Sequence, residues 1–206
     1  MDKLITGVKA FQENIYSNNK ELFKELAERQ APEVLFITCS DSRIDPNLIT
    51  QTQPGDLFIC RNAGNIVPPH SNATGGITSS IEYAVSVLKV RHVVICGHTG
   101  CGVMSAAMNP DTIKELPHVS NWLSLCSAAQ AKVRGRHKTI GDQHLLEMTE
   151  ENVLLQLKHL ETHPSVAEKM AAGTLELHGW VYGIADGSVE CYDPEQKAFT
   201  PIADRY

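Results

Sequence analysis

Apolar residues along the chain form two kinds of pattern, short continuous runs and longer stretches with a helical period. Runs at residues 34–38, 56–60 and 92–96 are rich in the side chains typical of strands that are buried on both faces of a parallel sheet. Between the last two runs, residues 74–89 repeat apolar positions with the period of a helix. This alternation of strand, helix and strand predicts an α/β fold, a mostly parallel β-sheet flanked by helices.

The first thirty residues carry a helical pattern of their own. Apolar positions such as Val8, Phe11 and Ile15 suit two amphipathic helices separated by residues 17–19. We expect this N-terminal helical arm, about residues 1–30, to pack on a neighbouring subunit. No linker rich in Pro, Gly or Ser divides the chain, so a single domain over residues 1–206 is expected.

Further helices and a hairpin are predicted in the second half of the chain. Helical periods are found at 119–132 and 143–160, and a shorter helix should begin after Pro164. Two late strands, 175–182 and 188–192, are joined by Asp186-Gly187, a hairpin turn signal.

Composition narrows the possible functions. The net charge is -6 with nine His counted as neutral, which argues against nucleic acid or an anionic membrane as the main partner. Charges and Gly7 interrupt the N-terminus where a signal peptide needs an apolar core, and no stretch is long enough to span a bilayer. We therefore expect a soluble cytoplasmic protein, whose six cysteines serve as buried small side chains or as metal ligands.

Three potential metal ligands follow two of the predicted strands. Cys39 comes directly after the run at 34–38, whereas His98 and Cys101 come after the run at 92–96. Carboxyl ends of parallel strands meet at one edge of a sheet, where open α/β folds place their chemistry. Two thiolates and one imidazole suit a catalytic zinc ion, because three protein ligands leave its fourth position open.

Chance spacing and other cysteine chemistries fit this pattern less well. A single His-x-x-Cys can arise by chance, and a lone buried Cys is usually only a packing residue. Here, however, two clusters each follow a strand, and Gly97, Gly100 and Gly102 allow sharp turns around the ligands. Redox chemistry would favour Cys-x-x-Cys, which is absent. A zinc deaminase needs His-x-Glu together with Pro-Cys-x-x-Cys, and that combination is absent too. Asp41 can reach either the zinc or Arg43, so it closes the site as a fourth ligand or leaves it open when paired with Arg43.

The motifs together resemble the β-class carbonic anhydrases. Cys-x-Asp-x-Arg at 39–43 precedes Pro-Gly-Asp at 54–56, Arg-Asn-Ala-Gly-Asn at 61–65 and His-x-x-Cys at 98–101. The likeness extends to His-Gly-Trp at 178–180, covers essentially the whole chain, and is strongest to the plant-type branch and to bacterial enzymes encoded beside cyanate-degrading genes.

This resemblance implies an activity and a set of site residues. The chain would catalyse zinc-dependent, reversible hydration of carbon dioxide to bicarbonate and a proton, by attack of zinc-bound hydroxide on CO₂. The resemblance assigns Cys39, His98 and Cys101 to Zn²⁺, Asp41 and Arg43 to a catalytic dyad, and Gln30, Phe58, Tyr83 and Gly102 to the substrate pocket. Gln30 would come from the partner of a homodimer or homotetramer.

Some features keep alternatives open. Relatives of this fold hydrolyse CS₂ or COS with the same ligands, and a non-catalytic protein stabilised by zinc is a third possibility. The allosteric branch of the family has Trp where this chain has Phe36, so no bicarbonate regulation is expected even though Arg61 and Tyr182 match that branch. Five of the other histidines are expected to be solvated, namely His118, His137, His144, His159 and His163.

Overall fold

The computed structural model describes residues 1–205, and their contacts divide the chain into two compact units, Met1–Ala31 and the remainder from Pro32 onward. Among the described residues, no helix is both long and apolar enough to cross a membrane.

The first unit consists of two helices, as the sequence predicts. Helix α1 (Asp2–Ala10) continues as a wider helical turn over Phe11–Tyr16, and α2 (Lys20–Glu28) follows a short break. Phe23 of α2 contacts Phe11 edge-on at 5.7 Å between ring centroids and contacts Tyr16 at 5.1 Å. These three rings hold the two helices together, while no residue of either helix is fully buried.

The second unit is built on one mixed sheet. Its six strands in the described residues have the order β2-β1-β3-β4-β5-β6. The first four in this order are parallel, whereas β5 and β6 join antiparallel, so the fold is α/β with a mostly parallel sheet, as predicted. The strands are β1 (Val34–Cys39), β2 (Leu57–Asn62), β3 (His92–His98), β4 (Glu176–Tyr182), β5 (Val189–Asp193) and β6 (Ala198–Pro201).

Strand β6 has no counterpart in the sequence prediction. It spans only Ala198–Pro201 and ends on a proline, which cannot donate to a strand ladder and is tolerated at a sheet edge. Four residues are also too few for an alternating pattern to be distinguished from a loop. The hairpin between β4 and β5 is confirmed.

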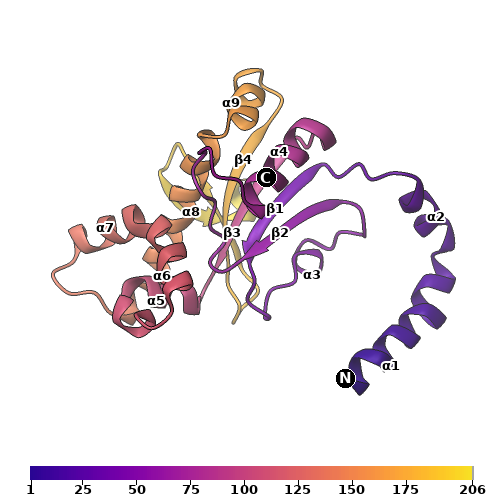
Figure 1. The fold of residues 1–206 in the computed structure, drawn as a ribbon, viewed down its shortest axis with the longest axis horizontal. Helices are drawn as coiled ribbons and strands as arrows, with labels where there is room; N and C mark the ends of the chain where they lie inside the picture. Colours follow the sequence, from indigo (N-terminus) through magenta and orange to yellow (C-terminus); the bar gives the residue numbers. More distant parts are fainter. Residues whose placement is uncertain (206) are drawn as a thin grey trace. The chain divides into compact units, whose positions relative to one another are not determined.

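Helices pack around the sheet in this unit (Figure 1). Helix α8 contacts both β3 and β4, and α9 packs on α8. The helix predicted over 119–132 is in fact two, α6 and α7, separated by a tight turn at 124–126. The helices are α3 (Pro46–Thr50), α4 (Gly76–Glu82), α5 (Gly102–Met108), α6 (Pro117–Leu123), α7 (Ser127–Arg136), α8 (Leu145–Glu161) and α9 (Pro164–Ala171).

Two glycines bring α8 close to the sheet. A Cβ added to Gly97 of β3 would lie 2.9 Å from side-chain carbons of Thr149 and Val153. A Cβ on Gly179 of β4 would lie 2.9 Å from Val153 and 3.0 Å from Leu157. The sequence interpretation of Gly97 as a turn residue is therefore wrong: Gly97 is a strand residue whose missing side chain makes room for a helix.

Strand alternation divides the core into layers. Leu35 and Ile37 face the main core beneath α4, α8 and α9, whereas Phe36 points to the other face beside Val94 and Trp180. A third cluster surrounds the carboxyl ends of β1 and β3, where Cys39 and Cys101 pack with Met104 of α5. The metal ligands predicted from the sequence thus lie in a buried layer at one end of the sheet.

Candidate metal centre

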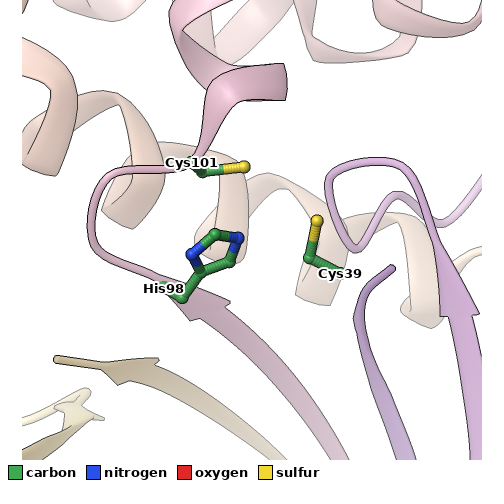
Figure 2. Close-up of side chains that lie close together, drawn as sticks. All are labelled: Cys39, His98 and Cys101. Atoms are coloured by element: carbon green, nitrogen blue, oxygen red, sulfur yellow. The ribbon is translucent and has the colours of Figure 1, made fainter. Parts of the chain in front are cut away.

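Cys39, His98 and Cys101 come together at the carboxyl edge of the sheet, as their places after two parallel strands require. Cys39 ends β1, His98 ends β3, and Cys101 directly precedes α5. Their side chains point toward one another (Figure 2), and one ligand atom from each lies within 4.8 Å of the other two. All three are at most 3% exposed, so the group is shielded from bulk water.

The tautomer of His98 is set by its neighbour. Nδ1 lies 3.0 Å from the carbonyl oxygen of Thr99, which can only accept, so Nδ1 carries the proton. Nε2 then holds a lone pair, is buried, and has no hydrogen-bond partner in the described part of the chain. A buried, unpartnered nitrogen facing two thiols is costly in a metal-free protein, and it fits a metal ligand.

The two thiols are coupled to each other. A hydrogen bond from Cys101 is the largest influence that lowers the pKa of Cys39, to about 4, and the N–H of Gly64 adds a weaker contact at 3.4 Å. The same interaction with Cys39, together with burial, raises the pKa of Cys101. One thiolate therefore forms readily, and a cation is needed to hold both deprotonated.

Asp41 and Arg43 form a bidentate ion pair beside the ligands. Nε of Arg43 donates to Oδ1 of Asp41 at 2.9 Å, and an Nη donates to Oδ2 at 2.7 Å. Arg43 accordingly holds the pKa of Asp41 well below its usual range. Oδ2 of Asp41 is 3.8 Å from Nε2 of His98, so the carboxylate borders the metal position while Arg43 holds it.

Two further groups fix this dyad; the turn at Gly100 was predicted from the sequence, but the contacts of Gly100 and Arg61 with the dyad and its backbone were not. Gly100 has a φ of +64°, which lets the chain reverse between His98 and Cys101, and its carbonyl accepts a 3.1 Å bond from Arg43. Arg61 of β2 donates to the carbonyl oxygens of Cys39 and Asp41, at 3.1 and 2.8 Å. The available signal for Arg61 was its place in the 61–65 motif. The signal for Gly100 was its place between two ligands.

The residues expected to bind substrate are scattered. Gly102 is the first residue of α5, next to Cys101. Phe58 and Tyr83 contact each other, with ring centroids 6.1 Å apart, but Phe58 pairs with Leu35, four residues before Cys39. That separation is about 13 Å along the sheet. Gln30 is exposed in the first unit, after α2.

Buried polar residues of α8 support the centre from behind, and the apolar pattern of that helix did not reveal them. Asn152 donates at 3.0 Å to the carbonyl of Gly64, whose N–H faces Cys39. Gln156 donates to Asn152 at 2.8 Å and accepts from the N–H of Val67 at 2.9 Å. Their four-residue spacing on one helix face was the usable signal.

Of the five histidines expected to be solvated, only His118 is exposed: His137 and His144 are partly buried, with His137 2.6 Å from a carboxylate oxygen of Glu147, and the other two hold a backbone segment. His163 is 2% exposed, with Nε2 2.9 Å from the carbonyl of Pro68. His159 is partly buried, with Nδ1 2.7 Å from the carbonyl of Val67. Burial lowers the pKa of both, so they act as neutral donors that fix the 67–68 segment against α8.

Comparison with known proteins places this arrangement among carbonic anhydrases. A sequence profile described as carbonic anhydrase matches residues 34–189. The chain is 44% identical to a carbonic anhydrase of Pseudomonas aeruginosa over 204 residues, covering 99% of this chain and 93% of the relative. It is 43% identical to carbonic anhydrase 1 of Escherichia coli O157:H7, covering 98% and 93%.

Solved structures show the same likeness. The β-carbonic anhydrase CcaA superposes with a TM-score of 0.95 at 41% identity, over 98% of each chain. One of two tetrameric β-carbonic anhydrases from Sordaria macrospora superposes with a TM-score of 0.84 at 31% identity, covering 97% of this chain and 98% of that one.

Proposed function

The chain belongs to the β-class carbonic anhydrases, and we propose that the metal held by Cys39, His98 and Cys101 is zinc. It catalyses the reversible hydration of carbon dioxide to bicarbonate and a proton. Two thiolates with one imidazole favour zinc over harder ions such as magnesium, which take oxygen ligands. The buried, unpartnered Nε2 of His98 between the two thiols is the observation that carries this assignment.

Zinc in such a site lowers the pKa of a coordinated water and so supplies a hydroxide nucleophile near neutral pH. The protein's contribution is a dry, preformed set of ligands. Thr99 fixes the tautomer of His98, and the N–H of Gly64 faces the sulfur of Cys39. Both contacts orient the ligands before any metal arrives.

We assign Asp41 and Arg43 the role of keeping the fourth metal position open. Arg43 engages both carboxylate oxygens of Asp41, which competes with their binding to the metal. A carboxylate held at this border can accept a hydrogen bond from a group at the open position and orient that group toward CO₂. A purely structural zinc site does not need a carboxylate to be held away from its fourth position. The ion pair therefore argues against the non-catalytic alternative.

The substrate pocket is proposed to be shared between subunits. Phe58 and Tyr83 lie toward the opposite end of the sheet from Cys39, so within one chain they cannot line its metal position. Gly102 can, because it adjoins Cys101. We therefore assign Gln30, Phe58 and Tyr83 to a pocket completed by the partner of a homodimer or homotetramer.

Exposed apolar side chains support this assembly. Leu4, Val8 and Ile15 are 66, 57 and 54% exposed, and they recur at helical spacing along the first unit. Tyr83 itself is 43% exposed, which is unusual for a residue expected to line an apolar pocket. The tetrameric state of the Sordaria enzymes is consistent with such contacts. Six unpaired cysteines support a reducing, cytoplasmic location.

Stopped-flow measurement of CO₂ hydration, paired with metal analysis, tests this function. The purified protein should contain about one zinc per chain and should lose activity when a chelator removes it. Cys39→Ser and Cys101→Ser should lose zinc and activity together, whereas Cys191→Ser, which alters a buried thiol in β5, should keep both. Full zinc content in either ligand variant would remove that residue from the ligand set.

A further inference from the structure

A second group of metal-ligating side chains lies at the amino end of the sheet. His92 begins β3, while Glu176 and His178 lie at the first and third positions of the neighbouring strand β4. One ligand atom from each lies within 4.8 Å of the other two. His92 and His98 are six residues apart on β3, so the group is about 20 Å from the catalytic centre.

Strand register creates this cluster. His92 pairs with Glu176 and Val94 with His178 in the parallel ladder between β3 and β4. Side chains two residues apart on a strand share a face, and paired residues on neighbouring strands share it too. The three side chains therefore project from the same face of the two strands, and the backbone holds them there without any loop.

The distances suit a single small cation. Without an ion the two rings share a hydrogen bond, with Nδ1 of His92 3.1 Å from Nε2 of His178, and Oε2 of Glu176 is 3.7 and 3.8 Å from these nitrogens. Ligands about 2.0 to 2.2 Å from a tetrahedral ion lie about 3.3 to 3.6 Å apart. Shifts of a few tenths of an ångström would complete the geometry, and the Glu176 side chain, 71% exposed, is free to make them. The His92 side chain is 39% exposed, which leaves a path from solvent.

The charges nearby are compatible with a cation. Glu176 supplies a negative charge at the group itself. Basic side chains also lie close by: Lys89, Arg91 and Lys169 line a cavity together with His92 and Glu176, and Lys169 pairs with Glu168 at 2.9 Å. The two nearest arginines are each engaged by a carboxylate of their own. Arg91 pairs with Glu33 at 3.4 Å, and Arg205, which is near enough to influence His178, pairs with Asp193 at 3.1 Å.

We propose that His92, Glu176 and His178 form a second metal site, which binds a divalent first-row transition ion such as zinc or cobalt. Two imidazoles and one carboxylate, with no sulfur, are ligands that these ions accept. The bound ion would join β3 to β4 at their amino ends and leave at least one coordination position for water.

Cobalt titration of enzyme that holds one zinc per chain, so that only the catalytic site is filled, tests the proposal. Binding is followed by metal analysis and by absorption, because thiolate ligands give cobalt a near-ultraviolet charge-transfer band that a site without sulfur lacks. The wild type should take up one cobalt per chain with no such band, and the ion should raise its Tm. His92→Ala and Glu176→Gln should each weaken this uptake by at least about 10-fold.

Controls separate the second site from other causes. His118→Ala, which removes an exposed histidine elsewhere, should bind cobalt as the wild type does. His92→Ala and Glu176→Gln should keep their zinc and full CO₂ hydration, which verifies that they are folded. Absence of a second equivalent in the wild type, undiminished uptake by His92→Ala, or growth of the thiolate band during uptake would each overturn the proposal.

Discussion

At the scale of single residues, one ion pair governs the proposed chemistry. Asp41 has two possible partners within reach, the guanidinium of Arg43 and a metal beside His98, and in this structure Arg43 holds both of its oxygens. Because the hydrogen bonds from Arg43 depress the pKa of Asp41, the carboxylate stays ionised throughout the neutral and alkaline range. Its contribution to stability is present above the usual carboxyl pKa, about 3.9, and is lost only as the pH falls through the depressed value.

Arg43→Ala should release Asp41 to the metal and lower kcat/KM for CO₂ hydration by roughly 100-fold or more, at every pH. Arg43→Lys keeps the positive charge but cannot make the bidentate pair, so an intermediate loss is expected. Stopped-flow kinetics, with zinc content measured in parallel, would check this. Wild-type activity in Arg43→Ala would show that the pair does not control access to the metal.

At the scale of elements, α8 joins the sheet to the metal centre. Its apolar side chains press on Gly97 and Gly179, while Asn152 and Gln156 hold the segment that carries Gly64. The helix therefore supports Cys39 indirectly, through its packing on β3 and β4 and through its hydrogen bonds to the segment that carries Gly64. Both kinds of contact depend on the distance between the helix and the sheet.

Gly179→Ala should destabilise the fold by about 1 to 3 kcal/mol, because the new methyl would overlap Val153 and Leu157 in a packed layer. Gly135→Ala is the matched control: a Cβ there meets nothing within 4 Å, and α7 should gain up to about 1 kcal/mol. Urea unfolding curves measure both changes. Equal stability of the two variants would contradict the close packing of α8 on β4.

Sequence patterns predicted the metal-ligating residues better than the residues that determine how helices and loops pack on the sheet. Cys39, His98 and Cys101 were found because ligand chemistry and strand ends coincide in the sequence. Gly97 was misread as a turn residue, since a glycine that admits a helix has the same letter as one that turns a chain. The burial of His163 could not be predicted, because it depends on the contact with the carbonyl of Pro68, a tertiary contact with no local signal.

At the scale of the whole molecule, the proposed substrate pocket requires a second copy of the chain. Phe58 lies about 13 Å along the sheet from the level of Cys39, Tyr83 contacts Phe58, and apolar side chains remain exposed along the first unit. Both observations point to an assembly that brings a second copy to the metal centre.

We expect the active species to be a dimer or larger. Sedimentation velocity at the enzyme concentration used for kinetics should show no active monomer of 22.6 kDa. Val8→Glu, which puts a charge on the exposed apolar face of α1, should weaken assembly and activity together. A fully active monomer would refute the shared pocket.

Activity should rise between pH 7 and pH 9. Two thiolate ligands cancel the charge of a divalent ion, so the pKa of its coordinated water should lie above that at a site with three imidazoles. Because Phe36 replaces the Trp of the allosteric branch, added bicarbonate should cause no steep cooperative shutdown near neutrality. A rate profile that falls from pH 7 to pH 9 would contradict this expectation.

The parallel register of β1 and β3 also determines when the metal can bind during folding. Cys39 and Cys101 are brought together only after the crossover through β2 and α4 has placed the two strands side by side. A nascent chain therefore has only His98 and Cys101 as a local ligand pair, and the second thiolate, from Cys39, joins them when the two strands pair. Complete binding of the metal is therefore a late step that stabilises a sheet already formed. A chelator should slow maturation without preventing the strands from pairing.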